Sequence, residues 1–221
     1  MAKYKLLVEG KGDQEFFKSY CNQVLGKDLI DIFPPKTLDN SSGDGWGNLI
    51  KNLPILLAQV KNGDIDKLGI ILDADYSPND TGGFSARFNL ITEQLRIYGY
   101  NIPTTHSPTK GDIFQHPDGL SDIGLWIMPD HQGDGMLENF IESLIASDTT
   151  QQSILDHAHL SISNLPVILF NQKLHQAKAK IFTWRAWQST PGLSLSKALN
   201  YGLLDLHNSA NFHTWLINVF K

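Results

Sequence analysis

The sequence predicts an α/β protein with a mostly parallel, Rossmann-like sheet, helices on both faces of the sheet, and a C-terminal helical extension. Short apolar runs alternate with segments of helical periodicity up to about residue 146. That alternation is typical of parallel strands joined by right-handed helical crossovers. From about residue 150 onward every signal is helical. We therefore expect an α/β domain over residues 1–148 and a helical appendage packed on it over residues 149–221.

Four segments have the composition of buried strands, namely residues 3–9, 30–33, 68–72 and 125–128. Each is a short, nearly continuous apolar run, as expected for a strand covered on both faces. The sequence Leu-Gly-Ile-Ile-Leu at residues 68–72 is the clearest of them. Residues 100–118 contain prolines and histidines with little periodicity, so no regular element is predicted there.

The segments between and after these strands have apolar residues at helical spacing. The predicted helices are 13–24, 49–60, 84–98, 136–145, 151–160, 171–188, 194–204 and 209–220. Asp13 is expected to cap the first helix, and Pro54 should kink the second helix or mark a fresh start within it. Glycine-containing polar segments at residues 39–47 and 77–83 are predicted loops.

Composition limits the class of function. The 221 residues carry a formal net charge of −5 and a sequence pI of about 5.9. This balance counts against non-specific binding of a long duplex, but not against an enzyme whose acidic residues are neutralised by metal. No apolar run approaches the ~20 residues of a membrane span, and the N-terminus lacks signal-peptide features. The single cysteine, Cys21, is interpreted as a core residue and fits a reducing, cytoplasmic setting.

Acidic residues follow three of the four predicted strands. Glu9 follows Leu-Leu-Val, whereas Asp73 and Asp75 follow Gly-Ile-Ile-Leu. Asp130 follows Leu-Trp-Ile-Met-Pro, and Asp13 lies one helical turn beyond Glu9. Ligands of open parallel sheets bind beyond the carboxyl ends of the strands. If the strands are neighbours, these side chains should converge on one rim of the sheet.

A cluster of carboxylates predicts a hard divalent cation. Packed carboxylates repel one another and lose hydration, and a bound cation relieves both costs. Mg²⁺ prefers oxygen ligands and usually takes a few carboxylates together with substrate phosphates. The sequence therefore predicts an Mg²⁺ (or Mn²⁺) site whose candidate ligands are these five carboxylates, and a phosphodiester or phosphate as substrate. Two such ions about 4 Å apart could activate water and stabilise a leaving oxygen.

Each candidate also has an ordinary structural interpretation. Asp13 and Asp130 suit helix capping or turn formation, whereas Glu9 is neither a good cap nor a turn former. Glu138 lies opposite the apolar stripe of its helix, so we expect it on a solvated face. The eight histidines show no metal-binding spacing.

Two lysines on the predicted helix 171–188 are further candidates. Lys178 or Lys180 could bind phosphate or stabilise developing charge if the helix lies near the acidic rim. The alternative is a solvated basic face. Arg185 lies two turns after Lys178 and shares its face, whereas Lys180 is offset from that face.

The acidic motifs resemble the toprim domain of topoisomerases, primases and related nucleases. That family has a strand ending in Glu-Gly and a later strand ending in Asp-x-Asp, as in residues 7–10 and 72–75 here. In the overcoming-lysogenisation-defect nucleases a second acidic residue follows four positions after the Glu, the place that Asp13 fills. The resemblance covers about residues 3–130. It implies that Glu9 acts as general acid/base or metal ligand, and that the Asp-x-Asp pair binds metal.

The whole chain is also similar to a group of uncharacterised bacterial toprim-like proteins. The shared motifs are Val-Glu-Gly at 8–10, Trp-Ile-Met-Pro-Asp at 126–130, Lys-Ala-Lys at 178–180, Ala-Trp-Gln at 186–188 and Pro-Gly at 191–192. The sequence has no topoisomerase tyrosine context and no helicase or zinc module, which argues against a topoisomerase or replicative primase.

Three functions remain open at this point. The leading hypothesis is an Mg²⁺-dependent toprim-type enzyme that acts on nucleic acid or another phosphate-bearing substrate. It would act as a nuclease or, alternatively, as a nucleotidyl transferase. A second is a haloacid-dehalogenase-like phosphatase that uses Asp73 as nucleophile. In such phosphatases the nucleophile also lies in an Asp-x-Asp motif after a buried strand, but that motif normally opens the domain. Here it begins at residue 73. A third is a non-catalytic toprim-like module with a binding or regulatory role.

Overall fold

The computed structural model describes residues 3–38, 43–77, 82–145, 147 and 149–221. The strands are β1 (Tyr4–Leu7), β2 (Asp31–Phe33), β3 (Lys67–Asp73), β4 (Asp112–Phe114) and β5 (Ile123–Met128). The helices are α1 (Lys11–Val24), α2 (Trp46–Lys61), α3 (Phe84–Ile97), α4 (Leu137–Leu144), α5 (Thr149–Ser163), α6 (Gln172–Ala186), α7 (Leu195–Asn200) and α8 (Ala210–Phe220), with 3₁₀ turns η1 (Pro35–Thr37) and η2 (Leu206–Ser209).

The described strands form one mostly parallel sheet in the order β2-β1-β3-β5-β4. β1 pairs in parallel with both β2 and β3, and β3 pairs in parallel with β5. The chain leaves β1 towards β2 and then returns to the other side of β1 as β3. The direction of strand addition therefore reverses between β1 and β3. Such a switch point is where open α/β sheets bind their ligands.

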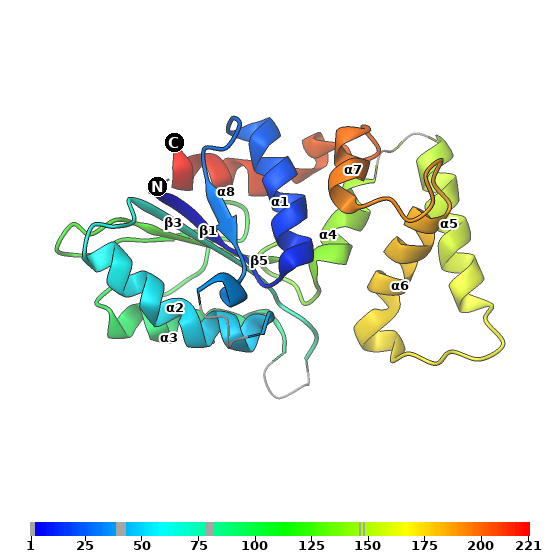
Figure 1. Ribbon diagram of the computed structural model, residues 1–221. Helices are drawn as coiled ribbons and strands as arrows, with labels where there is room; N and C mark the ends of the chain where they lie inside the picture. Colours follow the sequence, from blue (N-terminus) through cyan, green and yellow to red (C-terminus); the bar gives the residue numbers. More distant parts are fainter. Residues whose placement is uncertain (1–2, 39–42, 78–81, 146, 148) are drawn as a thin grey trace.

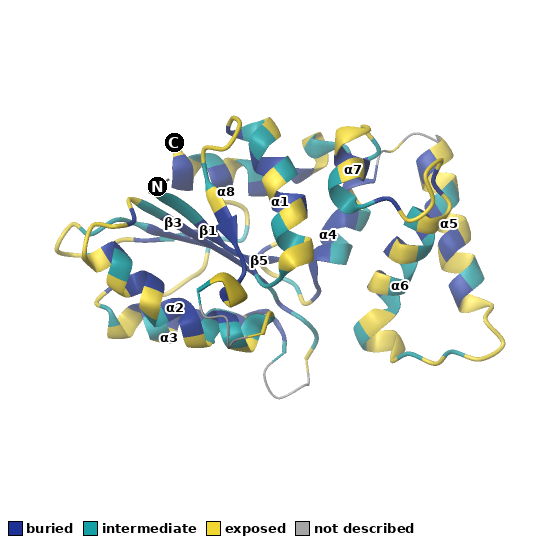
Figure 2. Cartoon of the chain, viewed as in Figure 1, coloured by how far each residue is buried: buried dark blue, intermediate teal, exposed yellow. Residues whose placement is uncertain are grey.

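Helices cover both faces of the sheet, which confirms the predicted fold class (Figure 1). α2 and α3 pack on one face and share an apolar core with side chains such as Leu7 and Ile70. α1, α4 and α8 pack on the opposite face, in a core that includes Leu6 and Ile71. Neighbouring strand residues point to opposite faces, so the continuous apolar runs are buried on both sides (Figure 2).

The structure corrects three details of the sequence prediction. Residues 112–114, inside a segment given no element, form β4, which pairs antiparallel with β5. Pro54 lies inside one helix, α2, so it does not mark a fresh start, and the expected kink stays a prediction. Asp13 is not the N-cap of α1. Gly10 is the N-cap, and the Asp13 side chain lies three residues inside the helix, where it accepts a hydrogen bond from the Gly10 backbone N–H at 2.8 Å.

The C-terminal part of the chain has two packing roles. α5 and α6 pack against one another and project beyond the sheet (Figure 1). α8 instead returns to the sheet and packs on β3 and β5. The proposed division at residues 148/149 stays a prediction, and residue 148 lies outside the described residues. Residues 39–42 and 78–81, which belong to the two predicted loops, also lie outside the described residues.

No described helix combines the length and the apolar character that crossing a membrane requires.

Two glycines allow α8 to approach the sheet closely. A Cβ atom built on Gly124 of β5 would lie 2.3 Å from Cγ2 of Val219 in α8. One built on Gly69 of β3 would lie 3.0 Å from Cζ of Phe220 in α8 and 2.8 Å from Cδ1 of Leu6 in β1. Neither position therefore has room for a side chain without a shift of its neighbours. The contact between α8 and the sheet therefore depends on the lack of side chains at these positions.

Gly124→Ala is predicted to destabilise the protein by about 1–3 kcal/mol, the usual cost of overpacking a close contact. Gly47→Ala is the matched control because Gly47 lies in α2 with no heavy atom within 4 Å of its Cβ position. It should be neutral or slightly stabilising, since alanine favours helix more than glycine does. Chemical denaturation of both variants measures the difference. Equal stability of the two variants would contradict this description of the α8 contact.

Candidate active site

Glu9 and Asp73 meet at the switch point of the sheet. Leu7 of β1 pairs with Ile70 of β3, so the residues that follow the two strands lie side by side. The Glu9 Oε1 atom accepts a hydrogen bond from the Asp73 backbone N–H at 2.9 Å. The pairing register therefore brings together two carboxyl groups that lie 64 residues apart in the chain.

The Asp73 side chain also contacts the start of α4. Its Oδ1 atom accepts a hydrogen bond from the Leu137 backbone N–H at 2.8 Å. Backbone N–H groups of a first helical turn have no partner within the helix and favour a negative charge. The second oxygens of Glu9 and Asp73 accept no hydrogen bond from the residues that the structure describes. Each carboxyl group thus has one oxygen held by backbone and one available for a ligand.

A cavity of about 370 Å³ lies over these two carboxyl groups. Its lining residues come from the strand ends, from α2 and α3, from the start of α4, and from α6. They are Glu9, Trp46, Asp73, Asp75, Gly82, Arg87, Met136, Leu174, His175 and Lys178. α6 therefore covers the carboxyl edge of the sheet, and it brings a lysine and a histidine to the acidic cavity.

Asp75 is paired with a buried arginine. Its backbone adopts a φ of 58°, in the left-handed region that aspartate tolerates better than most residues. Asp75 and Gly135 exchange two backbone hydrogen bonds, of 2.7 and 2.9 Å, which hold this turn against the segment before α4. The Arg87 Nη2 atom lies 2.5 Å from Asp75 Oδ2. Asp75 therefore already has a counter-charge, unlike the pair formed by Glu9 and Asp73.

Arg87 is held from several directions. It is 1% exposed, its Nε atom donates to the Asp73 carbonyl oxygen at 3.3 Å, and its guanidinium lies 3.8 Å from the ring centroid of Trp46. Stacking on an aromatic face and pairing with a carboxylate are both interactions that suit the planar guanidinium. Arg87 is therefore a fixed positive charge in the wall of the cavity.

A second group of charged side chains extends the acidic surface. Glu138, expected on a solvated face, is only 13% exposed, and its Oε1 atom lies 3.6 Å from Lys178 Nζ. Burial, with a smaller contribution from the nearby Glu138, raises the pKa of Asp13 to about 6 against the opposing effects of the Gly10 hydrogen bond and Lys178. Lys178 is 52% exposed, so it remains accessible to a substrate at the mouth of the cavity.

Burial and mutual repulsion make the central carboxyl groups hard to ionise. Desolvation, followed by the charges of Asp13 and Asp75, raises the pKa of Glu9 to about 8 against the opposing Asp73 hydrogen bond. The pKa of Asp73 lies well above its ordinary value, chiefly because of burial and then because of Glu9. Strongly raised carboxyl pKa values in a cavity are typical of functional sites, although structural clusters also show them.

Three predicted site residues do not line the cavity. Asp13 lies near enough to raise the pKa values of Glu9 and Asp73, whereas Lys180 and Asp130 lie elsewhere. Lys180 pairs with Glu142 at 2.7 Å and does not line the cavity. The Asp130 carboxylate accepts hydrogen bonds from the backbone N–H groups of Gly133 and Gln132, at 2.8 and 3.2 Å. Asp130 therefore serves as a turn former after β5, its ordinary structural interpretation, and it borders a different pocket.

Sequence reasoning missed several residues of the site. Arg87, Trp46 and His175 belong to none of the acidic motifs, and the sequence does not show which helices line the cavity. An available signal was that Arg87 falls on the apolar face of helix 84–97, since Phe84, Ile91 and Leu95 of that helix are buried with it. An arginine on a buried face needs a partner carboxylate.

The donor set suits Mg²⁺ bound mainly by water and substrate. Among the residues that the structure describes, no group of three or more His, Cys, Asp or Glu side chains has the geometry to hold a metal. Mg²⁺ is commonly bound through only one or two carboxylates together with waters and phosphate oxygens. The open oxygens of Glu9 and Asp73 match that smaller donor set, and a cation there would relieve the repulsion between them.

Fold and site together define a Rossmann-like α/β protein with an acidic cavity at its topological switch point. A family model matches residues 3–221, and the chain belongs to that family, described as a protein of unknown function (DUF3226). No curated protein matches the sequence. No solved structure matches it either.

Arg87→Met is predicted to lower the free energy of unfolding by about 2 kcal/mol, because it leaves the Asp75 carboxylate without its partner. The loss should be smaller than for a fully buried pair, since 34% of the Asp75 side chain is exposed. Arg96→Met is the control, because Arg96 lies in the same helix but forms an exposed pair with Glu93. It should cost at most about 0.5 kcal/mol. Urea titration of both variants tests the prediction, and equal losses would refute it.

Glu9→Gln is predicted to stabilise the protein at alkaline pH. The folded pKa of Glu9, about 8, exceeds the ordinary value of 4.5, so folding favours the protonated form. Stability is therefore lost as the pH rises from about 4.5 to 8, while glutamine has no proton to lose. In the presence of a chelator, the free energy of unfolding of the variant should exceed that of the wild type by roughly 1 kcal/mol or more at pH 8 and by little at pH 4.5. Urea titration at the two pH values measures this difference.

Glu15→Gln, on the exposed side of α1, provides the matched control for this comparison. The difference in the free energy of unfolding between Glu15→Gln and the wild type should be the same at the two pH values. A Glu9→Gln difference that is equally independent of pH would show that the Glu9 carboxyl group is not perturbed by its surroundings.

Proposed function

We propose that this protein is a divalent-cation-dependent, toprim-type enzyme that cleaves phosphodiester bonds of nucleic acid. The observation that carries the proposal is the pair of adjacent carboxyl groups, Glu9 and Asp73, which line the same cavity and each have one oxygen that accepts no hydrogen bond from the described residues. Their raised pKa values identify a site that favours added positive charge. The toprim-like motifs supply the same two residues.

Glu9 and Asp73 would hold the Mg²⁺ (or Mn²⁺) ion, with Asp13 close enough to affect both charges. The ion would supply Lewis-acid activation of water and neutralise charge on the phosphate. Proton transfer is the alternative role of Glu9 when it does not ligate the ion, because in the cation-free site its pKa of about 8 lets the carboxyl group retain its proton near neutral pH.

The positive residues of the cavity have different roles in this proposal. Arg87 is fixed by Asp75 and Trp46, so it orients the acidic turn and contributes a constant positive charge to the cavity wall. Lys178 is accessible and pairs only loosely with Glu138, at 3.6 Å. It is therefore the better candidate to contact a phosphate oxygen and to stabilise developing charge. The single buried cysteine, Cys21, fits an enzyme of the reducing cytoplasm.

Calorimetric titration with Mg²⁺ and Mn²⁺, together with a nuclease assay on single-stranded DNA and RNA, tests the proposal. The wild type should bind the cation and cleave at least one substrate. Asp73→Asn should reduce cleavage by about 100-fold or more, a typical effect of losing a group that stabilises transition-state charge. Asp130→Asn is the matched control and should retain activity, because Asp130 does not line the cavity.

The other outcomes separate the alternatives. A phosphatase with Asp73 as nucleophile would hydrolyse phosphomonoesters, form a phosphoenzyme, and retain this activity in Glu9→Gln. Absence of both cation binding and cleavage would refute the proposed enzyme.

A binding or regulatory module is the second candidate, and the pair formed by Asp75 and Arg87 favours it. That pair neutralises one carboxylate of the Asp-x-Asp motif without a cation. The cavity could then recognise a phosphate-bearing ligand without cleaving it. Cation-dependent binding of an oligonucleotide with no product over a long incubation would support this candidate.

A further inference from the structure

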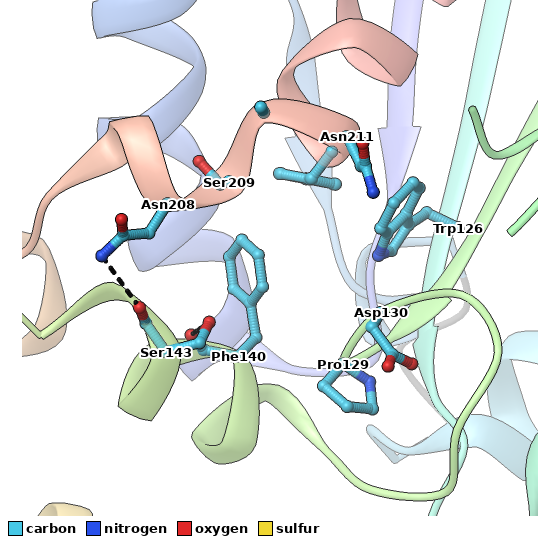
Figure 3. Close-up of a pocket in the computed structure, with 10 residues that line it drawn as sticks. Trp126, Pro129, Asp130, Phe140, Ser143, Asn208, Ser209 and Asn211 are labelled. Carbon is cyan, nitrogen blue, oxygen red and sulfur yellow. Dashed lines mark hydrogen bonds between the residues drawn. The ribbon is translucent and has the colours of Figure 1, made fainter. Parts of the chain in front are cut away.

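A second pocket lies between the end of β5, α4, and the segment from η2 to the start of α8 (Figure 3). Its volume is about 210 Å³. None of its lining residues lines the acidic cavity, so conclusions about this pocket do not depend on the proposed function. No sequence motif pointed to it, because its walls come from segments far apart in the chain.

The pocket contains a buried hydrogen-bond donor without an acceptor. Trp126 is 2% exposed, and its Nε1 atom is the one buried side-chain nitrogen or oxygen, among the described residues, that has no hydrogen-bond partner. Two other buried indoles have acceptors: Trp184 donates to Gln151 at 3.1 Å and Trp215 to the Asp112 carbonyl oxygen at 3.4 Å. Buried N–H groups are rarely left unpaired.

The indole of Trp126 is held in place and directed at the pocket. Its ring stacks on His131, with centroids 5.2 Å apart, and meets Phe212 edge to face at 5.3 Å. His131 is itself fixed, because it accepts a hydrogen bond from the Ile127 N–H and contacts Asp112 at 2.8 Å. Figure 3 shows the indole nitrogen on the side of the ring that faces the pocket. An acceptor atom bound in the pocket would satisfy it.

The residues that line the pocket do not favour an anionic ligand. The described residues that line the pocket include Asp130 but no lysine, arginine or histidine. The aromatic rings of Phe140 and Phe212 instead favour a flat, apolar body. The amides of Asn208 and Asn211 add groups that both donate and accept hydrogen bonds. Asn208 already donates to the Ser143 carbonyl oxygen, whereas the Asn211 side chain makes no hydrogen bond to the described residues.

The volume limits the size of the ligand. Sites for drug-sized molecules usually occupy about 300–1,000 Å³, so this smaller pocket suits a single ring system. A compact ring with a carbonyl acceptor and further polar atoms on its edge matches both the donor at Trp126 and the amide of Asn211. Nucleobases have this combination of features.

We propose that the pocket binds an uncharged nucleobase-type heterocycle, with a ring carbonyl oxygen accepting a hydrogen bond from Trp126 Nε1 and the Asn211 amide bonding another edge atom. The ring packs against Phe140 and Phe212. The shared chemistry is that of the base itself, whether it is a free heterocycle or an unpaired base of a nucleic-acid strand.

Indole N–H signals of protein labelled with ¹⁵N at tryptophan, in nuclear magnetic resonance spectra, test the proposal. Trp126→Phe identifies the Trp126 signal. Titration with uracil should move this signal downfield to saturation, because its N–H gains an acceptor, while the Trp184 signal stays in place. Benzene, which fills space without offering a carbonyl acceptor, should cause no such downfield shift.

Asn211→Ala should weaken uracil binding about tenfold, the effect of losing one good hydrogen bond. Asn218→Ala is the matched control, because Asn218 is an exposed asparagine of the same helix and does not line the pocket. A short oligouridine compared with free uracil identifies the source. A shift of the Trp126 signal by both supports a base within a strand, and a shift by uracil alone supports a free heterocycle.

An unchanged Trp126 signal with both probes would overturn the proposal and leave a pocket filled by water. An equal downfield shift with benzene, or undiminished uracil binding by Asn211→Ala, would also overturn it, because the carbonyl acceptor or the amide would then not be recognised.

Discussion

Two carboxyl groups in adjacent, poorly hydrated positions are the constraint on which the rest of the site depends. Glu9 and Asp73 are held by backbone N–H groups of β3 and α4, so neither can turn away from the other. Ionising both without a counter-charge is costly, which explains why both pKa values lie above their ordinary range. Arg87 does not relieve this repulsion fully, because it is paired with Asp75. The folded protein can therefore lower the electrostatic cost of this carboxyl pair by binding protons or a cation.

The topology of the sheet explains why the repulsion occurs at this position. Because β1 and β3 are parallel neighbours, their carboxyl ends share one edge, and strand addition reverses between them. The two glycines under α8 allow one face of the sheet to be closed by the last helix, while α6 lies across the carboxyl edge and brings Lys178 to the cavity. The C-terminal segment therefore contributes both to the core and to the site.

Much of the fold could be predicted from the sequence, because four strands are short apolar runs that only a doubly covered sheet can bury. β4 was missed because it has only three residues and begins with Asp112, whose role in holding His131 is visible only in space. Glu9 and the Asp-x-Asp motif were found from position and composition together. Arg87, Glu138 and the pocket at Trp126 were not found, because which face a helix presents to distant segments is set by tertiary packing.

The central claim is that Glu9 and Asp73 share one divalent cation, and an anomalous difference map from a crystal soaked in Mn²⁺ tests it most directly. The account predicts a peak in the acidic cavity, within coordinating distance of the open oxygens of both carboxyl groups, which is lost in crystals of Asp73→Asn. A fully soaked crystal with no peak between these two side chains, or with its peak at Asp130 instead, would contradict it.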